Sequence, residues 1–193
     1  MYNFKLTLSL PDSLFSQWES HADDALGKNT HPDRKKGYCF AREALRLVLQ
    51  EYNLAPTIPD LTLQVFHCLN KWPEYTLSLS HSKRAGAAVV AKRTEYLAVG
   101  IDIELEDREV KPETLLRISH PQDIKLRNIE IWCLKEAIFK CLMNTDKFEH
   151  PFEFSQIQIT KELWSHSPSG LAGAWELKHS MQHVIALASI PLG

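Results

Sequence analysis

Two long stretches with helical spacing dominate this sequence, and short strand patterns flank each of them. The first covers about residues 32–52 and the second about residues 121–143, and in both the apolar residues recur at intervals of three and four. Segments of strand length lie before and after both helices. The order strand, helix, strands therefore occurs about twice. This order predicts an α+β chain of two similarly organised halves, residues 1–98 and 99–193.

The shorter elements follow from the same patterns. Helical spacing predicts two further helices, over residues 11–26 and 112–118. Alternation or a short apolar run predicts strands over residues 1–10, 61–67, 75–80, 86–91, 96–105, 152–160, 174–178 and 184–190.

Composition excludes several classes of function. The chain has 22 Lys and Arg against 24 Asp and Glu, a net charge of −2, so no bulk electrostatic attraction to nucleic acid or to an anionic membrane is expected. It contains only 7 glycines and has neither a GxGxxG nor a Walker A sequence, and HExxH and GxSxG are absent too. Dinucleotide-binding, P-loop, zincin and α/β-hydrolase sites are therefore excluded.

Cysteine usage and hydropathy indicate a soluble cytoplasmic protein. The four cysteines show no CxxC spacing and lie in apolar stretches, which suits reduced thiols. No apolar run approaches the roughly 20 residues that span a bilayer. The N-terminal residues alternate like a strand rather than forming the apolar core of a signal peptide. We expect neither export nor a membrane span.

The densest functional signal is the sequence GIDIE at residues 100–104, within a predicted strand. Because strand side chains alternate, Asp102 and Glu104 share one face, which Glu106 could extend, while the isoleucines face the other way. Neighbouring carboxylates repel one another unless a cation lies between them, and oxygen ligands favour Mg²⁺ or Mn²⁺ over Zn²⁺. The alternative is an acidic sheet edge that simply faces solvent.

The second long helix carries the next signal. Trp132, Glu136 and Lys140 are spaced four apart and share a face, whereas Lys135 is turned by about 100° from Glu136. A carboxylate and an ammonium on one helix face could meet the carboxylates of the strand. The alternative is an ordinary Glu–Lys pair on the helix surface.

Two segments nearer the N-terminus carry groups that suit anions. Ser80 and His81 are adjacent on a strand and point to opposite faces, which argues against a Ser-His nucleophile pair and for anion contacts by His81. Arg34, Tyr38 and Arg42 are spaced four apart on the first long helix, and guanidinium groups suit phosphate recognition. The alternatives are a hydrogen-bonding residue at a strand end and a solvated basic helix start.

Taken together, these segments resemble the 4′-phosphopantetheinyl transferase family. The GIDIE strand is followed by WxxKEAxxK about 30 residues later and preceded by SLSHS about 20 residues earlier, with RxxxYxxxR upstream. Because a whole half precedes GIDIE, the chain resembles the larger form, which activates surfactin and enterobactin synthetases. That resemblance implies a pseudo-twofold monomer in which each half packs a long helix on a small antiparallel sheet, with the active site in the cleft between the halves.

The resemblance also implies an activity. Such an enzyme transfers the 4′-phosphopantetheine group of coenzyme A to a serine of an apo acyl or peptidyl carrier protein and releases adenosine 3′,5′-bisphosphate. It implies that Asp102, Glu104 and Glu136 hold Mg²⁺, or Mn²⁺, and that Lys135 and Lys140 stabilise developing charge. Glu136 would also take the serine proton, directly or through water.

The N-terminal half is implied to be the nucleotide-binding side. The larger form often has a Gly-Lys-Pro element ahead of the SHS strand, and this chain has Asn70-Lys71-Trp72-Pro73 instead. The residues expected to contact the 3′-phosphate and ribose end of coenzyme A are Arg34, Arg42, Ser80 and His81, followed by Lys83 and Lys71.

Two rival functions come from other classes. A metal-dependent nuclease also pairs carboxylates with a lysine, but its pattern requires lysine at position 106, where this chain has Glu106, and the net charge does not favour DNA. A noncatalytic relative that binds coenzyme A or a carrier protein is the second rival. The presence of all three carboxylates and both lysines favours the enzyme over this relative.

Overall fold

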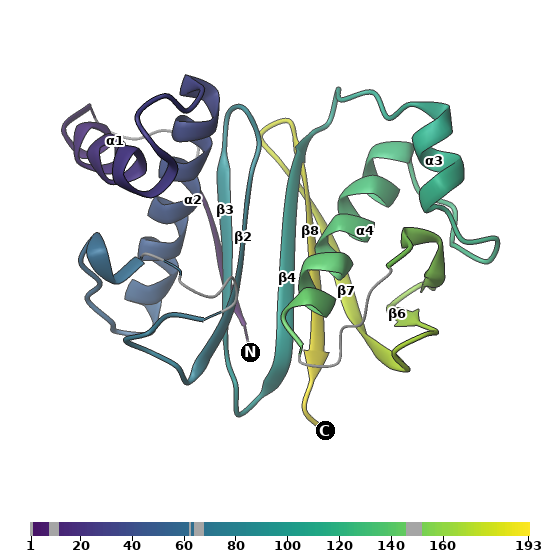
Figure 1. Cartoon of the computed structure of the whole chain (residues 1–193). Helices are drawn as coiled ribbons and strands as arrows, with labels where there is room; N and C mark the ends of the chain where they lie inside the picture. The colour runs from purple at the N-terminus through teal and green to yellow at the C-terminus, as the bar shows by residue number, and fades with distance from the viewer. Residues whose placement is uncertain (1, 8–11, 62, 64–67, 146–151) are drawn as a thin grey trace. The chain divides into compact units, whose positions relative to one another are not determined.

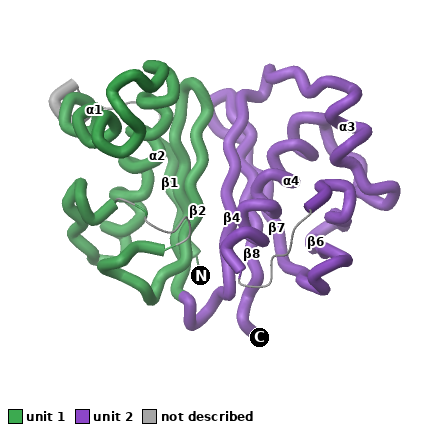
Figure 2. The backbone as a smooth tube through the Cα atoms, viewed as in Figure 1, with its two compact units in different colours: residues 1–92 green, residues 93–193 purple. Residues whose placement is uncertain are grey.

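The structure is a computed structural model, and it describes residues 2–7, 12–61, 63, 68–145 and 152–193. The chain divides into two compact units, residues 1–92 and 93–193, coloured separately in Figure 2. The sequence placed the division at residue 98, which lies inside the strand Tyr96–Leu105, whereas the units divide ahead of that strand.

The first unit packs two helices on a three-stranded antiparallel sheet of order β1-β3-β2. Helix α2 covers the sheet and packs more extensively on β3 and β1 than on β2 (Figure 1). The elements are β1 (Asn3–Thr7), α1 (Asp12–Leu26), α2 (Pro32–Glu51), the short 3-10 helix η1 (Pro59–Leu61), β2 (Tyr75–His81) and β3 (Gly86–Lys92).

Two glycines let α2 lie directly on this sheet. A Cβ at Gly86 would collide with the backbone of Phe40 and Ala41, and a Cβ at Gly37 would collide with the ring of His81. The helix then buries an apolar face against the sheet. This contact places His81 beside the first turns of α2.

The second unit packs α3 and α4 on a five-stranded antiparallel sheet of order β4-β8-β7-β6-β5. Helix α4 lies across β4 and β8 (Figure 1). The elements are β4 (Tyr96–Leu105), α3 (Pro112–Ile118), α4 (Asn128–Met143), the 3-10 helix η2 (Phe154–Gln156), β5 (Ile157–Ile159), β6 (Leu163–His166), β7 (Leu171–Ser180) and β8 (His183–Pro191).

Helix α4 approaches β4 closely at Gly100, in the middle of the strand. A Cβ there would collide with the carbonyl oxygen of Ala137 and the amide nitrogen of Cys141, so the strand backbone lies against the helix backbone. Asp102 and Glu104 follow on the same face of the strand. The sequence therefore places both carboxylates on the face that α4 covers.

The structure confirms a mixed α+β chain with antiparallel sheets and corrects several elements. Helix α4 begins at Asn128 rather than at residue 121, because Asp123 leaves helical geometry to accept hydrogen bonds from the amides of His120 and Ile159, each at 2.8 Å. Residues 152–160 form a 3-10 turn and a short strand, and β6 was not predicted. The predicted strand 61–67 falls mostly outside the described residues.

Among the described residues, the sheet of the first unit has three strands and that of the second unit has five. Among the helices that the structure describes, none has the length and apolar character required to cross a membrane.

Gly100→Ala should destabilise the protein by about 1–3 kcal/mol, the usual cost of overpacking a tight interior contact. Denaturant unfolding measures this loss. Gly100→Ala also replaces a glycine within a strand, which by itself changes the conformational entropy lost on folding. Ala172→Gly, at an exposed position of β7, measures the size of this entropic effect. A Gly100→Ala variant as stable as the wild type would show that α4 can move away from β4 without cost.

Candidate active site

The face between β4 and α4 brings together the carboxylates and the ammonium that the sequence singled out. Asp102 is buried, and its Oδ1 lies 2.7 Å from Nζ of Lys140, in the last turn of α4. Glu136 lies one turn earlier and is half-buried. Burial raises the pKa of Glu136 above its ordinary 4.5, and the charge of Asp102 raises it further. Asp102 therefore lies close enough to Glu136 to disfavour the charged form of the Glu136 carboxyl group.

Glu104 is held by two donors at one oxygen. The indole Nε1 of Trp132 donates to Oε1 of Glu104 at 3.1 Å, and Nη1 of Arg108 forms an ion pair with the same oxygen. The guanidinium carbon of Arg108 lies 5.3 Å from the centre of the Trp132 ring. A carboxylate, a guanidinium and an indole thus form one contact group beside Asp102 and Glu136.

The donor atoms suit a hard divalent cation, although the side chains are not gathered around one point. Asp102, Glu104 and Glu136 offer only carboxylate oxygens, the ligands that Mg²⁺ and Mn²⁺ prefer. Within the described part of the chain, no three His, Cys, Asp or Glu side chains are placed to hold a metal ion. Glu104 instead contacts Arg108, and Asp102 contacts Lys140.

Lys135 lies apart from this group. Its side chain is fully buried, its Nζ lies 2.9 Å from Oδ2 of Asp123, and it donates to the carbonyl oxygens of Phe154 and Ile157. Burial lowers the pKa of Lys135, while Asp123 acts in the opposite direction. Through these contacts, Lys135 links α4 to the segment before it, at Asp123, and to the segment after it, at Phe154 and Ile157.

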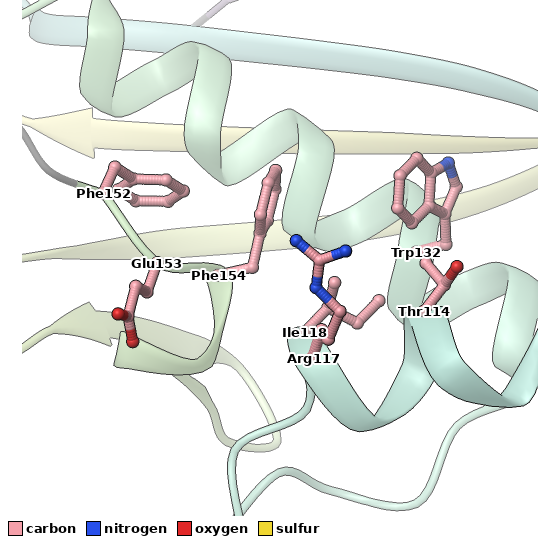
Figure 3. Close-up of a pocket in the computed structure, with 7 residues that line it drawn as sticks. All are labelled: Thr114, Arg117, Ile118, Trp132, Phe152, Glu153 and Phe154. Atoms are coloured by element: carbon pink, nitrogen blue, oxygen red, sulfur yellow. The ribbon is translucent and has the colours of Figure 1, made fainter.

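A pocket of about 600 Å³ adjoins the carboxylates through Trp132 (Figure 3). The Trp132 ring stacks on Phe154 with ring centres 6.4 Å apart, and Phe152 packs edge-on against Phe154. The pocket is lined by Thr114, Arg117, Ile118, Trp132, Phe152, Glu153 and Phe154. The same indole thus forms part of the pocket wall and donates to Glu104.

In the first unit, the two arginines differ in environment. Arg34 is exposed in the first turn of α2. The guanidinium of Arg42 lies 4.5 Å above the ring of Tyr38, and burial lowers the pKa of Arg42. Arg42 therefore contacts Tyr38, whereas Arg34 lies two turns earlier on α2.

The other candidates of this unit are scattered around β2. Ser80 is buried in the strand, whereas His81 and Lys83 are exposed at its end. Lys71 lies 2.9 Å from Oδ2 of Asp60 and 5.0 Å from the ring centre of Trp72. The hydrogen bond from Lys71, with others from Thr57, lowers the pKa of Asp60 to about 2. Lys71 is thus already paired within its own loop.

Sequence reasoning missed Arg108 and Asp123. Arg108 follows Glu104 by four residues, but it lies in the turn after β4, where strand alternation no longer predicts orientation. Asp123 is 12 positions before Lys135 and was assigned to the helix itself. A buried lysine within an apolar helical stretch was the one available signal, because such a charge requires a partner.

Residues 98–188 match the family model of the 4′-phosphopantetheinyl transferase superfamily, so this part of the chain is a domain of that superfamily. The match runs from β4 to β8 and includes both the GIDIE strand and the WxxKEAxxK helix. It confirms the family resemblance for this region and lies within the second unit. A comparison with curated proteins finds no match.

Lys135→Met should destabilise the protein by about 3–5 kcal/mol, because it leaves the buried Asp123 carboxylate without its counter-ion. Adding Asp123→Asn should restore part of the loss by removing the orphaned charge. Lys178→Met is the matched control: Lys178 pairs with Glu176 at the surface, where such a pair contributes about 1 kcal/mol or less. Equal denaturation midpoints for Lys135→Met and Lys178→Met would contradict a structural role for Lys135.

Glu136→Gln should raise the melting temperature at pH 7 in metal-free buffer. Because the folded protein holds the pKa of Glu136 above 4.5, ionising this group costs stability as the pH rises past that value. The gain is about 2–4 °C for each 1 kcal/mol of cost removed, and it should vanish below pH 4.5. Calorimetry against Glu109→Gln, which removes a charge from an exposed position, gives the comparison; a gain independent of pH would refute this explanation.

Proposed function

We propose that this protein transfers the 4′-phosphopantetheine group of coenzyme A to a serine of an apo acyl or peptidyl carrier protein, releasing adenosine 3′,5′-bisphosphate. A domain of this superfamily indicates phosphopantetheine transfer in general. The observation that carries the proposal is the group formed by Asp102, Glu136 and Lys140 between β4 and α4, with Glu104 held beside it by Trp132.

The carboxylates are the proposed metal site. Asp102, Glu104 and Glu136 would hold Mg²⁺ or Mn²⁺, and the bound cation would supply Lewis-acid stabilisation of the charge on the diphosphate. Lys140, whose side chain is 28% exposed, would donate to a phosphate oxygen. Asp102 positions that ammonium.

Glu136 is the proposed general base. Its raised pKa makes it a stronger proton acceptor than an ordinary carboxylate. It would take the proton of the carrier serine, directly or through water, as the serine oxygen attacks the phosphorus that bears the pantetheine arm. The bond from that phosphorus to the bridging oxygen breaks, and adenosine 3′,5′-bisphosphate leaves.

The pocket beside Trp132 is the proposed site of the pantetheine arm. Its aromatic walls suit the apolar parts of the arm, and the Thr114 hydroxyl and the Arg117 guanidinium can meet its amide groups. Because the carbonyl group of Phe154 accepts a hydrogen bond from Lys135, we assign Lys135 to positioning this wall rather than to the reacting phosphate.

The nucleotide contacts are proposed for the first unit. Burial disfavours the charged form of Arg42, and a bound phosphate would offset that cost. Arg34, Ser80 and His81 are the further contacts, with Lys83 next; Lys71 already pairs with Asp60. These groups would hold the 3′-phosphate and ribose end of coenzyme A.

The deciding experiment incubates the full chain with coenzyme A, Mg²⁺ and a panel of apo carrier proteins, and measures the intact mass of each carrier. The wild type should add one phosphopantetheinyl group to a carrier, and Asp102→Ala should abolish the addition because a metal ligand and the partner of Lys140 are lost. Asp107→Ala, an exposed carboxylate in the turn after β4, should remain active.

Failure of transfer with retained binding would identify the protein instead as a noncatalytic coenzyme A or carrier-binding relative.

Dephospho-coenzyme A, which lacks the 3′-phosphate, tests the nucleotide contacts in the same assay. The wild type should discriminate against it by roughly ten- to hundredfold, and Arg42→Ala should discriminate less, because charge-assisted hydrogen bonds to phosphate have about this strength. Equal discrimination would place the 3′-phosphate site elsewhere.

A further inference from the structure

Arg108 pairs with Glu104, a carboxylate that the proposed function assigns to a metal ion as a ligand. Its guanidinium pairs with Oε1 of Glu104, the oxygen that also accepts the Trp132 indole hydrogen bond. Nothing in the motifs of the sequence required a cation at this place. The pair lies at the rim of the site, with 46% of the Arg108 side chain and 15% of the Glu104 side chain exposed.

The charges of the group are nearly balanced before any metal ion binds. Asp102, Glu104 and Glu136 contribute up to three negative charges, and Lys140 and Arg108 contribute two positive charges. A divalent cation added to this group would leave it with an excess of positive charge. An anionic ligand such as a diphosphate would then be needed to restore the balance.

We infer that Arg108 competes with the divalent cation for Glu104. The metal ion therefore binds tightly only together with a diphosphate, whose oxygens replace Glu104 as the partner of the guanidinium. This inference rests on the proposed function. In the free protein Arg108 acts through Glu104, and in the complex its guanidinium contacts the diphosphate.

The surroundings of Arg108 suit such an exchange. Partly exposed ion pairs are weak, so Glu104 can be released at small cost. The guanidinium also contacts the Trp132 ring, and this contact can hold it beside the pocket after it leaves Glu104. A planar guanidinium with five donors is suited to diphosphate oxygens.

The test titrates the full chain with Mn²⁺, with and without coenzyme A, and follows free Mn²⁺ by electron paramagnetic resonance. Arg108→Gln should bind Mn²⁺ more tightly than the wild type in the absence of coenzyme A, by about fivefold or more, the lower end of coupling between two ligands. The tightening that coenzyme A produces should shrink correspondingly. Arg108→Lys, which keeps the charge, should stay close to the wild type.

Arg46→Gln is the matched control, because it removes an arginine from a pair with Glu43 in the first unit and should leave Mn²⁺ binding unchanged. Arg108→Gln that binds Mn²⁺ equally or more weakly than the wild type would overturn the inference. If the wild type nevertheless modifies a carrier protein, the proposed function stands alone. If Mn²⁺ binds neither protein, both fail, whereas tighter binding by Arg108→Gln without any transfer by the wild type supports the inference alone.

Discussion

The direct contact between the backbones of β4 and α4 is the constraint on which the site depends. Only glycine, which has no Cβ, leaves room at position 100 for the Ala137 carbonyl group and the Cys141 amide. At this separation Lys140 reaches Asp102, and Trp132 reaches Glu104, without any intervening layer of side chains. A larger separation would replace these direct contacts with water.

The parts of the site that follow local periodicity were predictable. Alternation along residues 100–104 placed Asp102 and Glu104 on one face, and spacing by four placed Trp132 and Lys140 together; the structure shows both. Most helices and strands were found in the same way, and the second unit matches the superfamily to which the motifs pointed.

The remainder depends on contacts between segments that periodicity does not connect. Asp123, the partner of Lys135, lies ahead of α4 and delays the start of the helix, because its carboxylate turns inward to reach the ammonium and the β5 amide. Arg108 lies beyond the last residue of β4, where neither strand nor helix spacing sets its direction. Asp123 depends on a lysine 12 positions later, and Arg108 depends on Glu104 and on the Trp132 ring of α4.

The environment of Lys135 also determines its chemistry. A lysine ammonium has three N–H donors, and here the Asp123 carboxylate and two carbonyl oxygens accept from it while the side chain has no exposed surface. Reagents that acylate amines attack the neutral, accessible form, so this nitrogen is shielded from them as long as the second unit stays folded. Its acylation would therefore report on the opening of the fold, and a labelling time course would measure how often α4 separates from the segments on either side of it.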